Sequence, residues 1–414
     1  MKKRIFISIY YLQIGGAETS LIGLLNACDT EKYDVDLFVF NHSGEMMQYI
    51  PKSINLLPEE PMYAHMDGSL VKCLKDGYLS IALRRLWAQY RYKSRTQRNG
   101  KQNQEGVYTY IAKIVCPILP SLKKYGEYDL AISYIFPHQI VLDKVCAKKK
   151  ICWLHTDYTK VGIDPVEELK VWSRYDYISS ISQDVTKAFL SVFPSMIDKV
   201  IEIENIVPKA LINTKASDIS GVSKEFQRRN GETILVSVGR ICEAKNYDNI
   251  PYVAKTLKEL FAKGSGPTGA PASSNGFKWY IVGPGNHDDI DVLIEALGVR
   301  DVVVFLGPSC NPYPYIKACD IYVHPSRYEG KSIVVREAQI LCKPVIITNY
   351  PTAKSQIDDG VDGIICEMDN KKIAEAIYDL VMDKNKQQTL IDYLQIHDFA
   401  YLNEVEKIYK LIDA

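Results

Sequence analysis

The sequence lacks several features that would assign its class at once. It has no excess charge, because 50 basic residues balance 50 acidic ones. A neutral chain has no general attraction to nucleic acid or to an anionic membrane. No stretch approaches the roughly 18 consecutive apolar residues that a membrane-spanning helix needs. The sequence therefore predicts a protein that is soluble or only peripherally attached to a membrane.

Cysteine and histidine are present, but they show no metal-ligand pattern. None of the ten cysteines forms a Cys-x-x-Cys pair, and none has metal-ligand spacing with the seven histidines. Scattered thiols of this kind are typical of a reducing cytosol. The apolar run at residues 4–9 is too short for the core of a secretory signal peptide. We therefore expect a cytoplasmic protein without a metal centre.

Two blocks of alternating strands and helices make up most of the sequence, as expected for two domains in 414 residues. In the first block, apolar runs predict strands at residues 4–9, 33–40, 128–133, 151–154, 175–180 and 199–203. In the second block, they predict strands at residues 234–238, 279–282, 302–306, 320–323 and 345–348. The polar stretch at 209–232 indicates a linker. The pattern predicts an α/β fold with two Rossmann-like, doubly wound domains that face each other across a cleft.

Candidate chemistry is densest at residues 324–338. This stretch runs from a strand end through a turn into a helix, with Glu329 in the turn and Glu337 about two helical turns later. The two carboxylates are at most ~12 Å apart along the helix axis. The free N–H groups between them, which suit a phosphate, belong to Ser332, Ile333 and Val334. A nucleotide-sugar matches this arrangement, but acidic residues also occur at helix starts without any ligand.

Other strand ends carry glycines, cations or a histidine. Gly15 and Gly16 follow the first strand and would let a phosphate approach the backbone, although a tight turn alone also explains them. Arg240 and Lys245 follow the first strand of the second block and would neutralise a diphosphate, or they are plain surface charges. His155 follows another strand of the first block, where site residues of an open sheet collect.

Residues 72–101 form a basic segment in which nine basic residues face a single acid, Asp76. The basic residues are Lys72, Lys75, Arg84, Arg85, Arg91, Lys93, Arg95, Arg98 and Lys101. Apolar and aromatic side chains are interleaved with them. Such an amphipathic segment suits an anionic membrane surface or a phosphorylated acceptor. A solvated helix hairpin packed on the domain is the other interpretation, and nucleic acid has little support from one segment of a neutral chain.

Four motifs together resemble glycosyltransferase family 4, a large retaining family with the GT-B fold. They are Gly15-Gly16-Ala17-Glu18, Gly239-Arg240 with Lys245, Gly283-Pro284-Gly285, and the Glu-x7-Glu motif from Glu329-Gly330 to Glu337-Ala338. The motifs occur in the family's order and span nearly the whole chain. Residues 153–158 and 330–332 also resemble members that build bacterial surface and capsular polysaccharides.

The resemblance implies two domains with different partners. Residues 1–207, with a basic insert at about 60–125, would form the acceptor domain, and a helix at 399–414 would cross back onto it. Residues 208–398 would bind the nucleotide-sugar donor.

The resemblance also implies a role for each motif residue. Glu329 would hold the transferred sugar and Glu337 the ribose, while the diphosphate would lie against Arg240, Lys245 and the Gly16 backbone. The implied catalytic residues are His155, Glu329, Arg240 and Lys245. The implied donor-binding residues are Gly16, Gly283, Gly307, Ser332, Ile333, Val334 and Glu337.

The implied activity is metal-independent, retaining transfer of a sugar from a nucleotide-diphosphate sugar to a glycan or lipid-linked saccharide in surface polysaccharide synthesis. No cofactor is expected. The enzyme would work in the cytoplasm, where residues 72–101 would touch the inner face of the cell membrane. The alternatives are another GT-B enzyme, such as an epimerase or a phosphorylase, and a non-catalytic nucleotide-binding protein. The Glu-x7-Glu motif with its cations disfavours the epimerase, and a phosphorylase would need pyridoxal phosphate.

Overall fold

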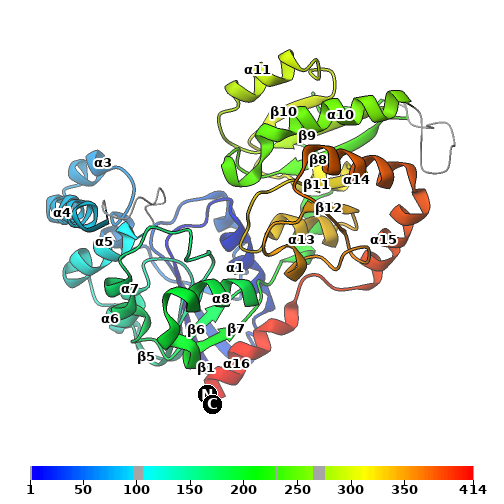
Figure 1. The fold of residues 1–414 in the computed structure, drawn as a ribbon. Helices are drawn as coiled ribbons and strands as arrows, with labels where there is room; N and C mark the ends of the chain where they lie inside the picture. Colours follow the sequence, from blue (N-terminus) through cyan, green and yellow to red (C-terminus); the bar gives the residue numbers. More distant parts are fainter. Residues whose placement is uncertain (1, 97–105, 230, 264–275, 414) are drawn as a thin grey trace. The chain divides into compact units, whose positions relative to one another are not determined.

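The computed structural model describes residues 2–96, 106–229, 231–263 and 276–413. The chain divides into two compact units, one formed by Met1–Ile206 with Tyr401–Ala414 and the other by Val207–Ala400. Each unit is built on one parallel β-sheet flanked by helices (Figure 1).

The N-terminal unit contains a seven-stranded parallel sheet in the order β3-β2-β1-β4-β5-β6-β7. Its strands are β1 (Lys3–Ile9), β2 (Tyr33–Val39), β3 (Asn55–Leu56), β4 (Glu127–Ser133), β5 (Cys146–Leu154), β6 (Tyr177–Ser180) and β7 (Val200–Glu202). Successive residues of β1, such as Ile5 and Phe6, are both buried, as expected for a strand covered on both faces. The two-residue strand β3 is too short to be predicted from periodicity.

The helices of this unit are α1 (Gly16–Ala27), α2 (Pro61–Ala64), α3 (Leu70–Lys75), α4 (Leu79–Thr96), α5 (Val107–Val115), α6 (Gln139–Lys144), α7 (Pro165–Trp172), α8 (Gln183–Val192) and α16 (Val405–Asp413). Helix α16 comes from the far end of the chain and packs on β2, where the Tyr409 ring stacks on Tyr33 with centroids 4.1 Å apart. It begins at Val405 rather than near residue 399, because Tyr401 turns the chain in a left-handed conformation (φ 56°).

The C-terminal unit contains a six-stranded parallel sheet in the order β10-β9-β8-β11-β12-β13. Its strands are β8 (Thr233–Val238), β9 (Phe277–Val282), β10 (Val303–Gly307), β11 (Ile321–His324), β12 (Val345–Thr348) and β13 (Ile364–Cys366). Its helices are α9 (Lys209–Lys215), α10 (Ile250–Lys263), α11 (Asp288–Ala296), α12 (Tyr313–Ala318), α13 (Ile333–Ile340), α14 (Asn370–Met382) and α15 (Lys384–Ile396). Successive residues of β8 lie in two different hydrophobic cores, one on each face of the sheet, because side chains alternate across a strand. Val236 belongs to one core and Leu235 to the other.

The expected linker at 209–232 is in part a helix. Its first residues form α9, and Ile212 of this helix is fully buried in the same core as Val236. The polar residues of the segment hid this short apolar contact, so the interpretation of the whole stretch as a linker was wrong.

Counted from the first strand of its own unit, the C-terminal sheet follows the strand order 3-2-1-4-5-6. The N-terminal sheet follows the same order and adds a seventh strand after the sixth. The order reverses direction between the first and fourth strands, so β1 lies beside β4 and β8 lies beside β11. In open α/β sheets, ligands bind outside the carboxyl ends of the strands at this reversal. The loops that follow β1, β4, β8 and β11 are therefore the first place to look for a site.

The basic segment corresponds to α3, α4 and the residues after them, of which Arg98 and Lys101 lie outside the described residues. Arg85 is only 3% exposed and donates hydrogen bonds to the carbonyls of His65, Asp67 and Gly68. It therefore faces the interior and does not contribute to the basic surface that the sequence predicted, because a buried guanidinium must be satisfied by acceptors. None of the described helices is long and apolar enough to span a membrane.

Candidate functional site

Most of the predicted donor residues lie in the C-terminal unit, at the carboxyl ends of its strands. Lys245 lies in the loop after β8 and Glu329 in the loop after β11, on either side of the point where the strand order reverses. Lys245 ends a short 3-10 turn, after which Asn246 adopts a left-handed conformation (φ 59°). The buried Asn246 side chain donates to the Pro325 carbonyl at 2.8 Å. This bond fastens the Lys245 loop to the segment that carries Glu329.

One carboxylate oxygen of Glu329, Oε1, is surrounded by three polar groups. Lys245 Nζ lies 2.6 Å away, Ser326 Oγ lies 2.7 Å away and His324 Nε2 lies 2.9 Å away. His324 is fully buried, and its Nδ1 lies 3.4 Å from the Tyr322 hydroxyl. No described residue donates to the other oxygen, Oε2, which remains able to accept from a ligand hydroxyl.

The charges in this cluster follow from burial and from these contacts. Burial raises the pKa of Glu329, but the bond from His324 and the charge of Lys245 outweigh it and lower that pKa to about 2. Burial lowers the pKa of His324, and the nearby Lys245 charge adds to this effect. A neutral His324 then donates through Nε2–H to the ionised Glu329. Glu329 is therefore a carboxylate near neutral pH, with one oxygen already saturated.

The turn that carries Glu329 is held from β12 and the loop after it. The Thr348 hydroxyl donates to the Ser326 carbonyl at 2.5 Å, and the Thr352 hydroxyl donates to the Glu329 carbonyl at 3.1 Å. These bonds fix the backbone on both sides of the carboxylate. A side chain held in this way is preorganised for a ligand, because little entropy is lost on binding.

The first turn of α13 offers fewer free N–H groups than the sequence suggested. The N–H of Ser332 donates to Gln356 Oε1 at 3.0 Å, so it is already engaged in this structure. Ile333 and Val334 follow in the first turn of the helix, where N–H groups have no acceptor inside the helix. These two residues are the better candidates for a phosphate contact.

Glu337 lies in the second turn of α13 and is 4% exposed. Its Oε1 accepts a hydrogen bond from the hydroxyl of Tyr313, the first residue of α12, at 3.0 Å. Burial raises the pKa of Glu337 to about 7, and the Tyr313 bond limits this rise. Near neutral pH, Glu337 therefore populates both its protonated and its ionised form, whereas Glu329 is ionised.

Three strand-end loops are tied together through their backbones. The Gly239 N–H donates to the Val282 carbonyl at 2.9 Å, and the Gly283 N–H donates to the Gly307 carbonyl at 2.8 Å. A Cβ at Gly283 would lie 2.0 Å from the Gly239 carbonyl oxygen, so only glycine fits there. Arg240 follows Gly239, is exposed and is bonded to no described residue, which leaves it available to an anion.

In the N-terminal unit, Gly16 and His155 lie at the equivalent end of the sheet. Gly16 begins α1 soon after β1, and His155 directly follows β5. Tyr134 connects these elements, because its ring centroid lies 4.8 Å from that of His155 and its hydroxyl donates to Ser20 of α1 at 2.8 Å. The buried Nε2 of His155 has no hydrogen-bond partner among the described residues. Burial lowers the pKa of His155 to about 4, so the ring is neutral at physiological pH.

A second buried histidine, His138, lies after β4 and was not predicted. Its Nδ1 lies 2.9 Å from the Ser133 hydroxyl, and its carbonyl accepts from the Tyr175 hydroxyl at 2.5 Å. Burial lowers the pKa of His138 to about 3, and His155 contributes to this shift. Its place after a central strand was the signal that could have found it.

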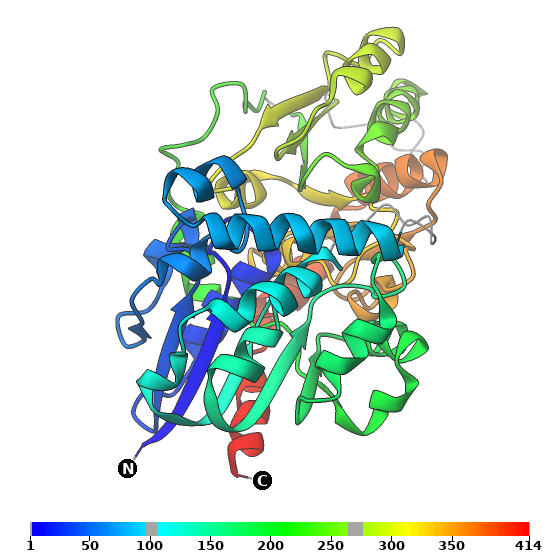
Figure 2. The ribbon, with the colours of Figure 1, turned by 90° about the vertical axis from the view of Figure 1, so that its left-hand side faces the viewer.

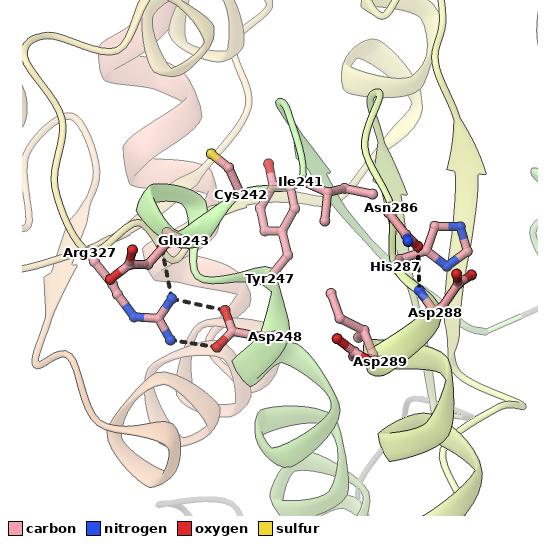
Figure 3. A pocket seen from close by; sticks show the side chains of 11 residues that line it. Ile241, Cys242, Glu243, Tyr247, Asp248, Asn286, His287, Asp288, Asp289 and Arg327 are labelled. Atoms are coloured by element: carbon pink, nitrogen blue, oxygen red, sulfur yellow. Dashed lines mark hydrogen bonds and ion pairs between the residues drawn. The ribbon is translucent and has the colours of Figure 1, made fainter. Parts of the chain in front are cut away.

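A pocket of about 600 Å³ lies beside the loop after β8 (Figure 3). Figure 3 shows Arg327 paired with Asp248 through both terminal guanidinium nitrogens, at 2.9 and 2.6 Å. The pocket is lined by Ile241, Cys242, Glu243, Tyr247, Asp248, Asn286, His287, Asp288, Asp289, Ile290 and Arg327. None of the predicted donor residues is in this lining, and its four carboxylates would repel a diphosphate. The motif residues therefore do not gather in this pocket.

A family model matches the unit that carries the Glu329 cluster. It describes glycosyl transferases group 1 and covers residues 220–396. Residues 220–396 of this chain therefore resemble the group 1 glycosyl transferases. The matched segment contains Arg240, Lys245, Glu329 and Glu337. The resemblance found in the sequence is thereby confirmed at the level of this broad group.

Two curated proteins are similar to parts of this chain. The Campylobacter jejuni N-acetylgalactosamine-N,N'-diacetylbacillosaminyl-diphospho-undecaprenol 4-alpha-N-acetylgalactosaminyltransferase is 27% identical over 173 residues, which are 41% of this chain and 39% of that protein. The Staphylococcus aureus capsular polysaccharide biosynthesis glycosyltransferase CapM is 35% identical over 89 residues, which are 21% of this chain and 23% of that protein. The chain thus spans less than half the length of either relative.

A solved structure has the same fold as this chain along nearly its whole length. The crystal structure of Anabaena HepE in complex with UDP and glucose aligns with a TM-score of 0.63, at 17% identity, over 99% of both chains. The two α/β units found here are those of a GT-B fold, so the predicted fold class is confirmed.

The structure brings some of the predicted site residues together and adds others. Lys245 contacts Glu329 directly, and Gly283 contacts Gly307 through the backbone. The residues that sequence reasoning missed are His324, Ser326, Tyr313, Thr352 and Gln356. His324 and Ser326 precede Glu329 within one turn, a spacing that could have signalled them, whereas Tyr313 is 24 residues from Glu337 and gave no local sign. No group of three or more metal-ligating side chains occurs within the described ranges.

Proposed function

We propose that this protein is a retaining family 4 glycosyltransferase that moves a sugar from a nucleotide-diphosphate sugar to a hydroxyl of a glycan or lipid-linked saccharide. The reaction would serve bacterial surface polysaccharide synthesis in the cytoplasm. The observation that carries the proposal is the Glu329 cluster, an ionised carboxylate with a cation 2.6 Å from one oxygen and the other oxygen open.

The named relatives support the partners in this proposal. The Campylobacter jejuni relative is named for transfer to a diphospho-undecaprenol-linked saccharide, which supports a lipid-linked acceptor. CapM is named for capsular polysaccharide biosynthesis, which supports the surface pathway. HepE was crystallised with UDP and glucose, which supports a nucleotide-sugar donor. A lipid-linked acceptor would bring the enzyme to the inner face of the cell membrane, where residues 72–101 would make peripheral contact.

Donor binding would use the charges found in the C-terminal unit. Glu329 Oε2 would accept from hydroxyls of the transferred sugar, and Glu337 would accept from ribose hydroxyls. The diphosphate would be bound by Arg240 as a planar fork and by Lys245 as a point charge. The N–H groups of Ile333 and Val334 would add backbone donors at the helix N-terminus.

In the transfer step, the bond between the anomeric carbon and the leaving phosphate oxygen breaks as the acceptor oxygen bonds to that carbon. Negative charge develops on the leaving diphosphate, and Arg240 and Lys245 would stabilise it without rearrangement. These cations supply charge that a metal ion supplies elsewhere, so the proposal needs no metal. Attack would occur on the face that the phosphate leaves, and the departing phosphate would take the acceptor proton. This course retains the anomeric configuration.

His155 has a limited part in this mechanism. With a pKa of about 4, His155 is unprotonated near neutral pH and would not serve as a general acid. Its neutral ring would instead donate or accept a hydrogen bond with a sugar hydroxyl. Gly16 would offer backbone N–H at the start of α1 to the diphosphate, as the resemblance implies.

The variant Glu329→Gln tests the proposal, because it removes the charge and keeps the shape. We expect kcat to fall by about 10²–10³-fold in a variant that still folds, as for loss of one preorganised contact. Turnover is measured as nucleoside diphosphate release from a panel of nucleotide-sugars, chosen by a thermal-shift screen. The matched control is Glu295→Gln, because the Glu295 side chain is 67% exposed. A folded Glu329→Gln enzyme with normal turnover would refute the assigned role.

A further inference from the structure

The outer side of α4 carries an apolar stripe. Its members are between 49% and 64% exposed, and each lies three or four residues from another member: Leu79, Leu83, Leu86, Trp87 and Tyr90. This spacing puts them on one side of the helix. The other side of α4, which includes Ile81, Ala88 and Tyr92, is buried against the unit. The buried side of α4 therefore packs on the rest of the unit, and the apolar stripe is exposed to solvent.

Helix α3 extends the apolar surface. Its Val71 is 61% exposed and its Leu74 is 48% exposed, and α3 packs beside α4. Of the 17 exposed large apolar residues in the described chain, seven lie on these two helices. Figure 2 shows α4 as the long blue helix that crosses the front of the N-terminal unit. Soluble proteins rarely gather so much apolar surface without a partner.

Basic residues border the stripe. At ~100° per residue, Arg91 falls on one side of it and Lys93 on the other. Lys72 and Lys75 lie on the exposed part of α3. The one acid of the segment, Asp76, lies 3.3 Å from His65. The remaining basic residues of α4 are engaged elsewhere, Arg84 with the Ile114 carbonyl and Arg95 with Asp164 and Glu167.

The aromatic residues of the stripe have the character of a membrane interface. The Trp87 and Tyr90 rings stack with centroids 5.7 Å apart, and the Arg91 guanidinium lies 6.0 Å from the Trp87 ring centroid. Tryptophan and tyrosine prefer the headgroup level of a bilayer, because one end of each side chain is apolar and the other is polar. A cation beside them would lie at the level of the lipid phosphates.

We infer that the stripe on α3 and α4 inserts into the surface of an anionic lipid bilayer, with Lys72, Lys75, Arg91 and Lys93 on the lipid phosphates. The inference deepens the membrane contact of the proposed function and rests on it for where the enzyme works, but it needs no catalytic step. A second copy of this chain fits less well, because self-association would press two cationic borders together. A saccharide fits less well too, since the stripe offers apolar carbon in place of hydrogen-bonding groups.

Trp87 provides a direct probe of this contact. It is 52% exposed, whereas the other three tryptophans, Trp153, Trp172 and Trp279, are at most 3% exposed. The full chain is titrated with vesicles of phosphatidylglycerol and phosphatidylcholine, and with vesicles of phosphatidylcholine alone. We expect the anionic vesicles to shift the tryptophan emission to shorter wavelength, with quenching by brominated acyl chains. Trp87→Phe should lose the shift and still co-sediment with the anionic vesicles.

A pair of variants tests the stripe itself. Leu83→Ser with Leu86→Ser should reduce partitioning into the anionic vesicles by about tenfold or more. The matched control replaces two apolar residues of the other unit that are 69% and 80% exposed, Val292→Ser with Ile396→Ser, and should bind like the wild type. Arg91→Glu with Lys93→Glu should weaken binding at low salt and differ less from the wild type at high salt.

The inference is overturned if the wild type does not bind anionic vesicles or if Leu83→Ser with Leu86→Ser binds at full strength. It is also overturned if the Trp87 shift depends on protein concentration without vesicles, which would indicate a second copy. Thermal shift with nucleotide-sugars is measured on the same samples. Intact donor binding without vesicle binding rejects the inference alone, and vesicle binding without donor binding rejects the proposed function alone.

Discussion

The loops after β8 and β11 of the C-terminal unit and the loops after β1, β4 and β5 of the N-terminal unit lie at comparable ends of two sheets with the same strand order. In the C-terminal unit, Glu329 is ionised and has Lys245, Ser326 and His324 around one oxygen. In the N-terminal unit, His155 is neutral, and its buried Nε2 lacks a partner among the described residues.

This difference teaches that one topology can hold two kinds of site. A fixed carboxylate with an adjacent cation suits a ligand that carries both hydroxyls and negative charge, which is the donor in our account. A buried polar atom without a partner costs stability, and such atoms in native proteins call for an explanation such as a ligand. A neutral imidazole suits an uncharged hydroxyl. Substitutions in the Glu329 cluster and at His155 should therefore have different effects.

The largest effect is expected when Lys245 is removed from the Glu329 cluster. Lys245→Ala should lower kcat/KM for the nucleotide-sugar by about 10²–10³-fold, because the leaving diphosphate loses a fixed cation. The control Lys258→Ala removes a lysine that pairs with Asp301 on the surface, and it should turn over normally. Steady-state kinetics of both variants decide the point. Equal rates for Lys245→Ala and the wild type would mean that this cation does not act on the donor.

The backbone contacts beside the Glu329 cluster predict a loss of stability. Gly283→Ala should lower the free energy of unfolding by about 1–3 kcal/mol, because its Cβ would meet the Gly239 carbonyl oxygen at 2.0 Å. Gly221→Ala is the control, since no atom lies within 4 Å of a Cβ there. Urea unfolding of the two variants measures the difference. A Gly283→Ala protein as stable as the control would show that these loops are loosely packed.

The contribution of His155 to stability should be sensitive to acid. The folded pKa of His155, about 4, lies below its unfolded value, so its contribution to stability is present above pH ~6.5 and is lost as the pH falls toward 4. At pH 5 the loss is about 2 kcal/mol. Burial raises the pKa of Glu168 to about 7, so its contribution to stability increases as the pH falls over the same range. The effect of His155 is therefore measured by comparing the wild type with a His155 variant.

The measurement is urea unfolding of the wild type and His155→Gln at pH 7 and pH 5. The wild type should lose more stability than the variant between these two values. Glu329 should not change the stability between pH 7 and pH 5. Its folded pKa is about 2, so the stability that it contributes is lost only as the pH falls from its ordinary pKa toward 2. The same pH dependence in both proteins would remove His155 as its source.

The smallest effect is expected at Glu337. Tyr313→Phe removes the bond that limits the raised pKa of this residue, so less of Glu337 is ionised at pH 7. The KM for the donor should rise a few-fold at pH 7 and recover toward pH 8.5, with kcat nearly unchanged. Glu337→Gln should abolish this pH dependence. Parallel pH profiles for Tyr313→Phe and the wild type would show that the bond does not tune donor binding.

Much of the fold was predictable, because strand ends are marked by residues with a clear physical meaning. Apolar runs gave the central strands of both sheets, and Gly283 and Pro325 marked where strands stop. The two-residue strand β3 and the short helix α9 were not predictable, since each contains too few apolar residues to show a period. Their place is set by tertiary contacts, such as the burial of Ile212.

The site was predictable as a set of residues but not as a bonded cluster. Glu329 and Lys245 were found from their positions at strand ends, whereas the contact between them joins residues 84 positions apart. The burial of Arg85 was readable in part, because Ile81, Ala82 and Ala88 share its side of α4 at helical spacing. Which side of an amphipathic helix with two apolar faces packs inward depends on the neighbouring helices and not on the helix itself.

The central claim is that the charged cluster between β8 and β11 is the donor site. Calorimetric titration of the full chain with UDP, GDP and ADP tests it most directly. Our account predicts that at least one of them binds, that Lys245→Ala weakens this binding by about tenfold or more, and that Glu329→Gln leaves it unchanged, because Glu329 contacts the sugar. Equal binding to the wild type and Lys245→Ala, or no binding of any of the three, would contradict it.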